Sequence, residues 1–348
     1  MRKSIFTALA AGAVVLAGCA KIETTEVPEG RVIGFDNFVT NAVKALDTEG
    51  DGGLTTFYVY GGHTDNTTLF AGTTVSYADG AWSYSPLKYW EATKTYNFAA
   101  YSNENGTAEN VSLVTDEGDN QYHLKIENYK SDGTKDLIYA YSHGIVCNDA
   151  EAALNMPSVE LTFYHILSRV AFKFTKDAVS LTGTDIAVSN IQIESLSDQG
   201  TFTGENITDA QCPYGAWNGQ TGTATQAFDQ AGTNISLTDG QADGQTDFEY
   251  LIPQAAGGTM TVTFTLTPTG TIVNENRVQS EGHEFSVTLP ATSDNQWNPG
   301  YTYVYTAEIN ASNFGLAPII FDVEEIKGWT GGTINEDDIL DDDITGTN

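Results

Sequence analysis

The stretch Thr259-Met-Thr-Val-Thr-Phe-Thr-Leu266 alternates between apolar and polar side chains along its whole length. The apolar members, at every second position, are Met260, Val262, Phe264 and Leu266. Successive side chains of a β-strand point to opposite faces, so this period of two residues predicts a strand. One face is apolar and the other carries only threonine, which is typical of a half-buried strand in an antiparallel sheet.

The same alternation recurs on both sides of this stretch. Residues 164–174 place Tyr164, Ile166, Val170, Phe172 and Phe174 on one side, and residues 301–309 do so with Tyr301, Tyr303, Tyr305, Ala307 and Ile309. Clusters of Gly, Asn, Asp and Thr between such runs supply turns. The pattern predicts an all-β protein built of sandwiches. Residues 205–245 are polar and weakly patterned, so we expect a long surface loop there.

The charge balance limits the partners of this chain. Its 348 residues carry 46 acidic and 15 basic side chains, a formal net charge of −31. Nucleic acid is excluded as a partner, because phosphates are bound through Lys and Arg. Aromatic residues make up 11% of the chain, which indicates packed cores rather than an acidic disordered segment. The length favours two domains.

The N-terminus has the form of a secretory signal. Arg2 and Lys3 precede a short apolar run that ends in Leu16-Ala17-Gly18-Cys19, which resembles a bacterial lipobox. The resemblance implies cleavage before Cys19 and acylation of that residue, with palmitate or a similar chain; the alternative is an ordinary signal peptide with a chance cysteine. Two or three acyl chains hold a protein on a membrane almost permanently. Ala20 is not the aspartate of inner-membrane retention, which favours the outer membrane.

No motif predicts catalysis, a cofactor or a metal site. Residues 47–54 resemble the first half of a calcium loop, but its twelfth position is Tyr58 instead of the glutamate that binds the ion. The five histidines are scattered without the spacing of zinc ligands. We therefore expect no enzyme. Cys147 and Cys212 form one disulfide or remain two thiols, and the sequence leaves both open.

Six short motifs, in order along residues 33–329, are similar to those of the fimbrillin family of Bacteroides-type bacteria. They are Lys88-Tyr89-Trp90 with Tyr96 to Ser102, Asp136 to Ala140, Val159 to Arg169, Leu251-Ile252-Pro253-Gln254, Pro299 to Tyr303, and Ile320 to Trp329. This chain departs from the family at Asn103, where the family tends to have proline.

The resemblance implies two tandem transthyretin-like antiparallel β-sandwiches. The expected divisions are a signal peptide at 1–18, an anchor segment with a removable first strand at 19–50, an N-terminal sandwich at 51–156, a C-terminal sandwich at 157–330 and an acidic tail at 331–348. His165 falls in one of the family motifs, where we expect a structural hydrogen bond.

The resemblance also implies a function. The chain would be a fimbrial subunit, or an accessory or tip adhesin, exported to the outer membrane through lipid on Cys19 and exposed on the cell surface. Ile33 and Phe35 alternate like a short edge strand. A protease with basic specificity would remove the anchor and this first strand by cutting after Lys44, or the anchor alone by cutting after Arg31; Lys44 is favoured. The next subunit would then insert a strand, head to tail.

Two further expectations concern ligands and the tail. The alternative function is a glycan-binding surface lipoprotein of a polysaccharide-uptake system, for which Trp217, in the polar stretch, is the candidate for a glycan contact. A fimbrial protein would also meet a host or bacterial surface ligand. After Trp329, the apolar residues do not alternate and six acids are present, so we expect a solvated tail rather than a donor strand.

Overall fold

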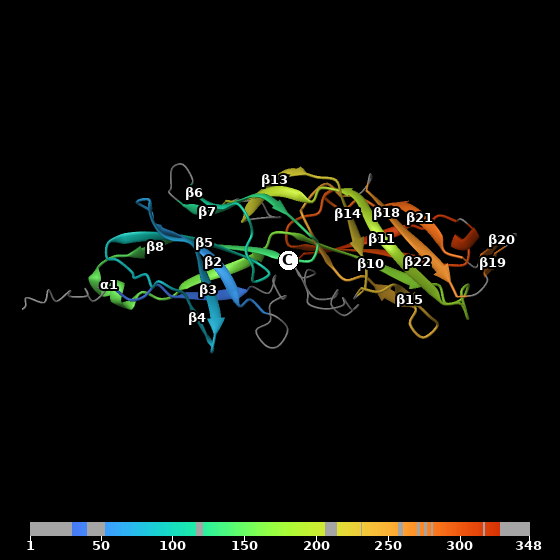
Figure 1. Ribbon diagram of the computed structural model, residues 1–348, viewed down its shortest axis with the longest axis horizontal. Coiled ribbons are helices and arrows are strands. Elements are labelled where there is room, and N and C mark those ends of the chain that lie inside the picture. The colour runs from blue at the N-terminus through green and yellow to red at the C-terminus, as the bar shows by residue number, and fades with distance from the viewer. Residues whose placement is uncertain are drawn as a thin grey trace, which may run out of the picture.

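The computed structural model describes residues 30–39, 53–115, 121–205, 214–230, 232–256, 260–269, 272–274, 277–279, 281–315 and 317–327. Figure 1 shows an elongated molecule with two groups of sheets side by side along its long axis. Almost all of its elements are strands, and the prediction of an all-β fold is confirmed. In this part of the chain, no helix is long and apolar enough to cross a membrane.

The first group contains a seven-stranded sheet faced by a four-stranded one. In spatial order, the large sheet is β1 (Phe35–Val39), β9 (Val159–His165), β8 (Leu137–Cys147), β5 (Lys94–Asn103), β2 (Thr56–His63), β3 (Thr67–Ala78) and β4 (Ala81–Ser83). The smaller sheet is β13 (Gly215–Thr221), β12 (Gln199–Gly204), β7 (Tyr122–Lys130) and β6 (Val111–Thr115). The short helix α1 (Ala150–Asn155) joins β8 to β9, and Asp149 caps its N-terminus.

The central strand of the large sheet, β5, is buried on both faces. Along β5, Tyr96, Phe98 and Ala100 belong to one apolar cluster, and Ala99 and Tyr101 belong to the other. The first cluster lies within the curl of the sheet, whose two end strands, β1 and β4, contact each other. The second cluster lies towards β7, β12 and β13 and includes Leu124, Phe202 and Trp217.

The second group is a sandwich of two smaller sheets. One sheet is β16 (Asp243–Gln245), β10 (Ser168–Lys176), β22 (Tyr301–Ile309) and β23 (Phe321–Lys327), with β17 (Glu249–Leu251) also on β10. The other is β14 (Ala224–Phe228), β11 (Ile186–Leu196), β18 (Thr261–Pro268) and β21 (His283–Thr288), with β15 (Ile235–Leu237) on β11. The hairpin β19 (Ile272–Asn274) and β20 (Arg277–Gln279) and the 3-10 turn η1 (Asn313–Gly315) lie beside each other.

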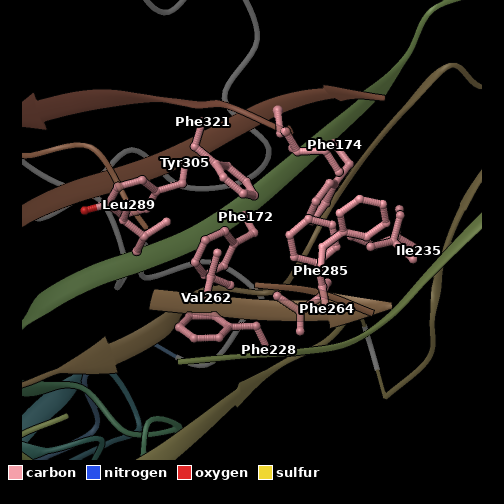
Figure 2. Packing of buried hydrophobic residues seen from close by; sticks show 14 of the residues in the cluster. Phe172, Phe174, Phe228, Ile235, Val262, Phe264, Phe285, Leu289, Tyr305 and Phe321 are labelled. Carbon is pink, nitrogen blue, oxygen red and sulfur yellow. The ribbon is translucent and has the colours of Figure 1, made fainter. Parts of the chain in front are cut away.

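The core of this second sandwich confirms the alternation read from the sequence. Val262, Phe264 and Leu266 of β18 are fully buried, and the threonines between them are only partly buried. Figure 2 shows Phe264 beside Phe172, Phe174 and Phe321, in the layer where side chains of both sheets meet. The strand predicted at residues 301–309 is β22, which contributes Tyr303 and Tyr305 to the same core.

Strand pairing corrects three expectations. Two pairs, β1 with β9 and β10 with β22, are parallel, although only antiparallel pairs were expected. The stretch from 164 to 174 is two strands rather than one, because the chain leaves the first group at Ile166 and Leu167 and enters the second as β10. Residues 214–245 are not a surface loop, because they contain β13, β14, β15 and β16.

The expected division after residue 156 is also not followed. β9 pairs with β8 and β1, and β12 pairs with β7, so both strands belong to the first group although they come after residue 156. The chain crosses from the first group to the second, returns for β12 and β13, and crosses again. The expected first strand and the 157–330 unit therefore share a direct contact, between β1 and β9.

Candidate functional site

The first strand, β1, lies at one end of the seven-stranded sheet. It pairs with β9 alone, in parallel register from Phe35 opposite Val159 to Val39 opposite Phe163. A strand at a sheet edge is held by backbone hydrogen bonds on one side only, so it can leave without opening the pairs of the remaining strands. β1 is also the first described strand of the chain, so its C-terminal end connects it covalently to the other described strands.

The residues just before β1 are clamped from two sides. The Arg31 N–H donates to the Ala153 carbonyl at 2.8 Å, while the Arg31 carbonyl accepts from the Trp90 N–H at 2.9 Å. The Ile33 N–H donates to the Lys88 carbonyl at 2.9 Å. Gly30 lies so close to the Trp90 carbonyl that a Cβ atom would clash with it. The segment is therefore fixed in an extended conformation between α1 and residues 88–90.

Phe35 fills a pocket made of aromatic rings. Its ring meets four others edge-on, with centroid distances of 6.2 Å to Phe57, 5.3 Å to Phe70, 5.8 Å to Tyr84 and 5.7 Å to Phe98. Only 4% of Phe35 is exposed. Edge-to-face pairs of this kind add to the gain from burial itself. If β1 left, the rings would line an empty apolar slot beside the bare backbone of β9.

The slot reaches beyond Phe35. Ile33, two residues earlier, is fully buried in the same cluster. The Tyr84 hydroxyl donates to the Ile33 carbonyl at 2.8 Å. Alternate residues of the segment thus point into the core, as the alternation of Ile33 and Phe35 predicted. An extended segment with apolar residues two apart is the shape that would refill the slot.

Of the residues predicted to be processed, Arg31, Lys44 and Cys19, the structure describes only Arg31. Arg31 is described: its side chain is exposed, and its guanidinium Nη1 donates to the Met156 carbonyl at 3.0 Å. Lys44 and Cys19 lie outside the described residues, as do the acidic tail and Cys212. Cys147 is a free, buried cysteine at the end of β8.

Trp217 is not in a loop, and this corrects its expected position. It lies in β13, is 9% exposed, and packs against Tyr129 and Phe202. The indole N–H donates to the Ile166 carbonyl at 2.5 Å, where the chain passes between the two groups of sheets. A ring enclosed in this way presents no free face to a sugar. The polar neighbours that suggested a loop are the exposed residues of a short strand.

His165 has the structural role that was expected of it. Its Nδ1 lies 2.6 Å from Asp136 Oδ2, and the histidine is almost fully buried. The alternation in the sequence placed His165 on the polar side, whereas β9 buries it on the same side as Leu161 and Phe163. The carboxylate partner depends on tertiary contact between β9 and the start of β8, which no local pattern indicates.

A metal site is not formed by the described residues. No three His, Cys, Asp or Glu side chains among them lie close enough together to bind an ion. Of residues 47–54, which resemble half of a calcium loop, residues 47–52 lie outside the described residues.

Comparison with known proteins gave a family and a fold. A family model described as fimbrillin-like matches residues 40–329. No curated protein matched the chain in sequence. A solved fimbrial protein from Bacteroides vulgatus is similar in structure, with 19% identity and a TM-score of 0.56, over 86% of this chain and all of that one.

Weaker likenesses include two proteins of Porphyromonas gingivalis. The fimbrial anchor protein Mfa2 has 13% identity and a TM-score of 0.38, over 86% of this chain and 98% of that one. The tip fimbrial protein Mfa3, truncated at its C-terminus, has 9% identity and a TM-score of 0.37, over 79% and 94%.

The family match extends over most of the chain, and the fold of the fimbrial protein from Bacteroides vulgatus agrees with it. Proteins of this family are structural and adhesive rather than enzymatic. This chain belongs to the fimbrillin-like family.

Proposed function

We propose that this protein is a fimbrial subunit, or an accessory or tip adhesin, that joins other subunits by strand exchange. In this proposal it reaches the outer membrane as a lipoprotein acylated at Cys19 and is displayed at the cell surface. Proteolysis then removes the N-terminal segment together with β1. The next subunit inserts an extended segment into the vacated slot.

The observation that carries the proposal is the placement of Phe35. It is the residue of β1 that lies among four aromatic rings, and β1 has a hydrogen-bonded neighbour on one side only. Loss of the strand would expose apolar surface and unpaired backbone together, and an incoming strand satisfies both. The contact is head to tail and does not close on itself, so repetition gives a filament.

We place the cut after Lys44 rather than after Arg31. The Arg31 backbone is hydrogen-bonded on both its N–H and its carbonyl, and a protease needs a free extended segment to bind. A cut there would also leave β1 attached to the rest of the chain. A cut after Lys44 separates β1 from the remainder of the protein and frees it to leave.

The test uses purified precursor kept off the membrane by Cys19→Ala. Limited trypsin treatment and subsequent mixing should give ladders on an unboiled gel, and N-terminal sequencing of the ladder should start at Ala45. Lys44→Ala should abolish the ladder, and the matched variant Arg31→Ala should keep it. A ladder that starts at Val32 would contradict the proposed cut, and the absence of any ladder from the trypsin-treated protein would contradict self-assembly of this chain. A glycan-uptake lipoprotein would give no ladder either.

A further inference from the structure

A polar cavity of about 390 Å³ lies at the edge of the second sandwich, and no residue of β1 lines it. Its lining residues are Lys173, Gln230, Gln241, Asp243, Gly244, Gln245, Thr246, Asp247 and Phe248. Most of them belong to β16 and to the segment between β16 and β17. A volume of several hundred Å³ is in the range of small-ligand sites.

The cavity has a structural origin in the edge strand. β16 pairs with β10 through Gln245 opposite Lys173, and β17 pairs with it through Glu249 opposite Val170. Three residues, 246–248, therefore oppose the two residues of β10 at 171–172. The extra residue is a β-bulge, a feature that bends an edge strand and redirects its side chains, often beside a functional site.

The bulge is held firmly. The Thr246 N–H donates to the Phe172 carbonyl at 2.9 Å, and the Thr246 hydroxyl accepts from the Phe172 N–H at 3.0 Å. The Asp247 N–H donates to the Asp229 carbonyl. The Arg169 guanidinium carbon lies 4.2 Å from the centroid of the Phe248 ring and fixes that ring. The cavity wall is thus preorganised.

Gly244 lines the cavity, and there is no space for a side chain at this position. A Cβ atom at this position would lie 2.5 Å from Ile235 Cγ2. Gly244 thus lies directly against Ile235 of the neighbouring strand β15. This close approach ties the cavity to the core of the sandwich rather than to a loop alone.

The lining groups are suited to hydroxyl groups. Three amides, from Gln230, Gln241 and Gln245, line the cavity, and each amide both donates and accepts. None of the three makes a side-chain hydrogen bond to another described residue. The carboxylates of Asp243 and Asp247 are acceptors. The Phe248 ring adds one apolar surface, against which the C–H face of a sugar ring packs.

Other classes of ligand fit less well. The cavity is lined by one ammonium group, on Lys173, and by two carboxylates, so an anionic ligand would be repelled. The Lys173 Nζ already lies 3.9 Å from Asp243 Oδ2. A strand cannot add at the bulge, because the N–H groups of Thr246 and Asp247 are both used inside the protein. A lipid would meet a single apolar side chain.

We propose that this cavity binds a neutral carbohydrate through the three glutamine amides and the Phe248 ring. The proposal goes beyond fimbrial assembly and does not depend on strand exchange. It assigns a class of ligand to a cavity of the second sandwich. An unassembled monomer presents this cavity as well as an assembled subunit does. The outcome of the carbohydrate-binding test is therefore independent of the outcome of the assembly test.

The experiment uses the full chain with Cys19→Ala, before any proteolysis. Microscale thermophoresis measures binding to six probes: maltoheptaose, cellohexaose, xylohexaose, chitohexaose, mannohexaose and laminarihexaose. At least one probe should bind. Gln230→Ala with Gln241→Ala should weaken that binding by about tenfold, as expected for two lost hydrogen bonds. The melting temperature should stay unchanged, because neither amide bonds to the protein.

A matched control removes an amide elsewhere. Gln192 lies on β11, in the other sheet, and Gln192→Ala should leave binding unchanged. Phe248→Leu keeps an apolar side chain but removes the ring, and it should also weaken binding. Failure of the wild-type chain to bind any of the six probes would overturn the proposal. Equal binding by the double variant, or tighter binding of a sulfated analogue, would overturn it as well.

Discussion

At the scale of single residues, the acidic composition places a partly buried carboxyl group, that of Glu249, among other acids. Glu249 of β17 accepts a hydrogen bond from Gln226 Nε2 at 2.8 Å and lies against Gly133, where a Cβ atom would clash with both side chains. Burial raises the pKa of Glu249 to about 8, and Asp229, Asp247 and Asp132 add to the shift. Only acids contribute, so the ionised form of Glu249 has no compensating charge.

This shift predicts how stability changes with pH. The Glu249 pKa is higher in the folded than in the unfolded chain, so folding takes up a proton between these two values. The contribution to the free energy of unfolding is greatest below pH 4.5 and is lost as the pH rises to about 8. Glu249→Gln should therefore stabilise the protein at pH 8, by about 2 kcal/mol after allowance for solvent screening.

The difference in the free energy of unfolding between Glu249→Gln and the wild type is measured by urea unfolding at pH 4.5 and pH 8. The gain should be near zero at the lower pH, because the wild-type carboxyl is then protonated in the folded chain. Glu308→Gln, which removes an exposed carboxylate on β22, is the matched control. A gain of the same size at both pH values would show that packing, rather than protonation, is responsible.

At the scale of elements, β1 shows how a short strand can matter more than its length suggests. Its register places Phe35 in the aromatic cluster, while its backbone has only β9 as a neighbour. In β1, the side chain of Phe35 contributes strongly to stability, whereas the backbone is hydrogen-bonded to one neighbouring strand. This combination suits an element that is exchanged for another.

Phe35→Ala should lower the free energy of unfolding by about 3–5 kcal/mol, because it leaves a cavity among four rings. Denaturation monitored by tryptophan fluorescence gives the value. The matched control is Tyr77→Ala, which truncates an aromatic residue that is 44% exposed on β3 and should cost about 1 kcal/mol or less. Equal losses for the two variants would mean that Phe35 does not anchor β1.

At the scale of the whole molecule, the chain connects its two groups of sheets repeatedly. Phe202 of β12 and Trp217 of β13 complete the second cluster of the first group, although β10 and β11 precede them in the sequence. Trp217 also bonds to Ile166 at the crossing. The first group therefore depends on residues far beyond the expected division after residue 156.

A fragment of residues 19–165 should consequently not fold by itself. It lacks β12 and β13, so part of the outer face of the large sheet would be exposed to water. We expect binding of the dye ANS and a poorly dispersed NMR spectrum, whereas residues 19–348 should unfold cooperatively. A fragment with dispersed resonances and cooperative unfolding would show that β6 and β7 alone are enough to cover the sheet.

The sequence by itself determined the fold class and the single strands. Alternation with a period of two is a local property, so β18 and β22 could be read from their own residues. The inward direction of Ile33 and Phe35 was local in the same way. The family motifs also pointed to the fimbrillin-like family, because they are short and occur one after another in order.

Only the tertiary structure decided which strands lie side by side. The parallel pairing of β1 with β9 joins residues more than a hundred positions apart, and β12 returns to β7 after two strands in the other group. The burial of Trp217 and the partner of His165 depend on these pairings. Local periodicity specifies which face of a strand is apolar, but the apolar face that covers it is chosen by packing of the whole chain.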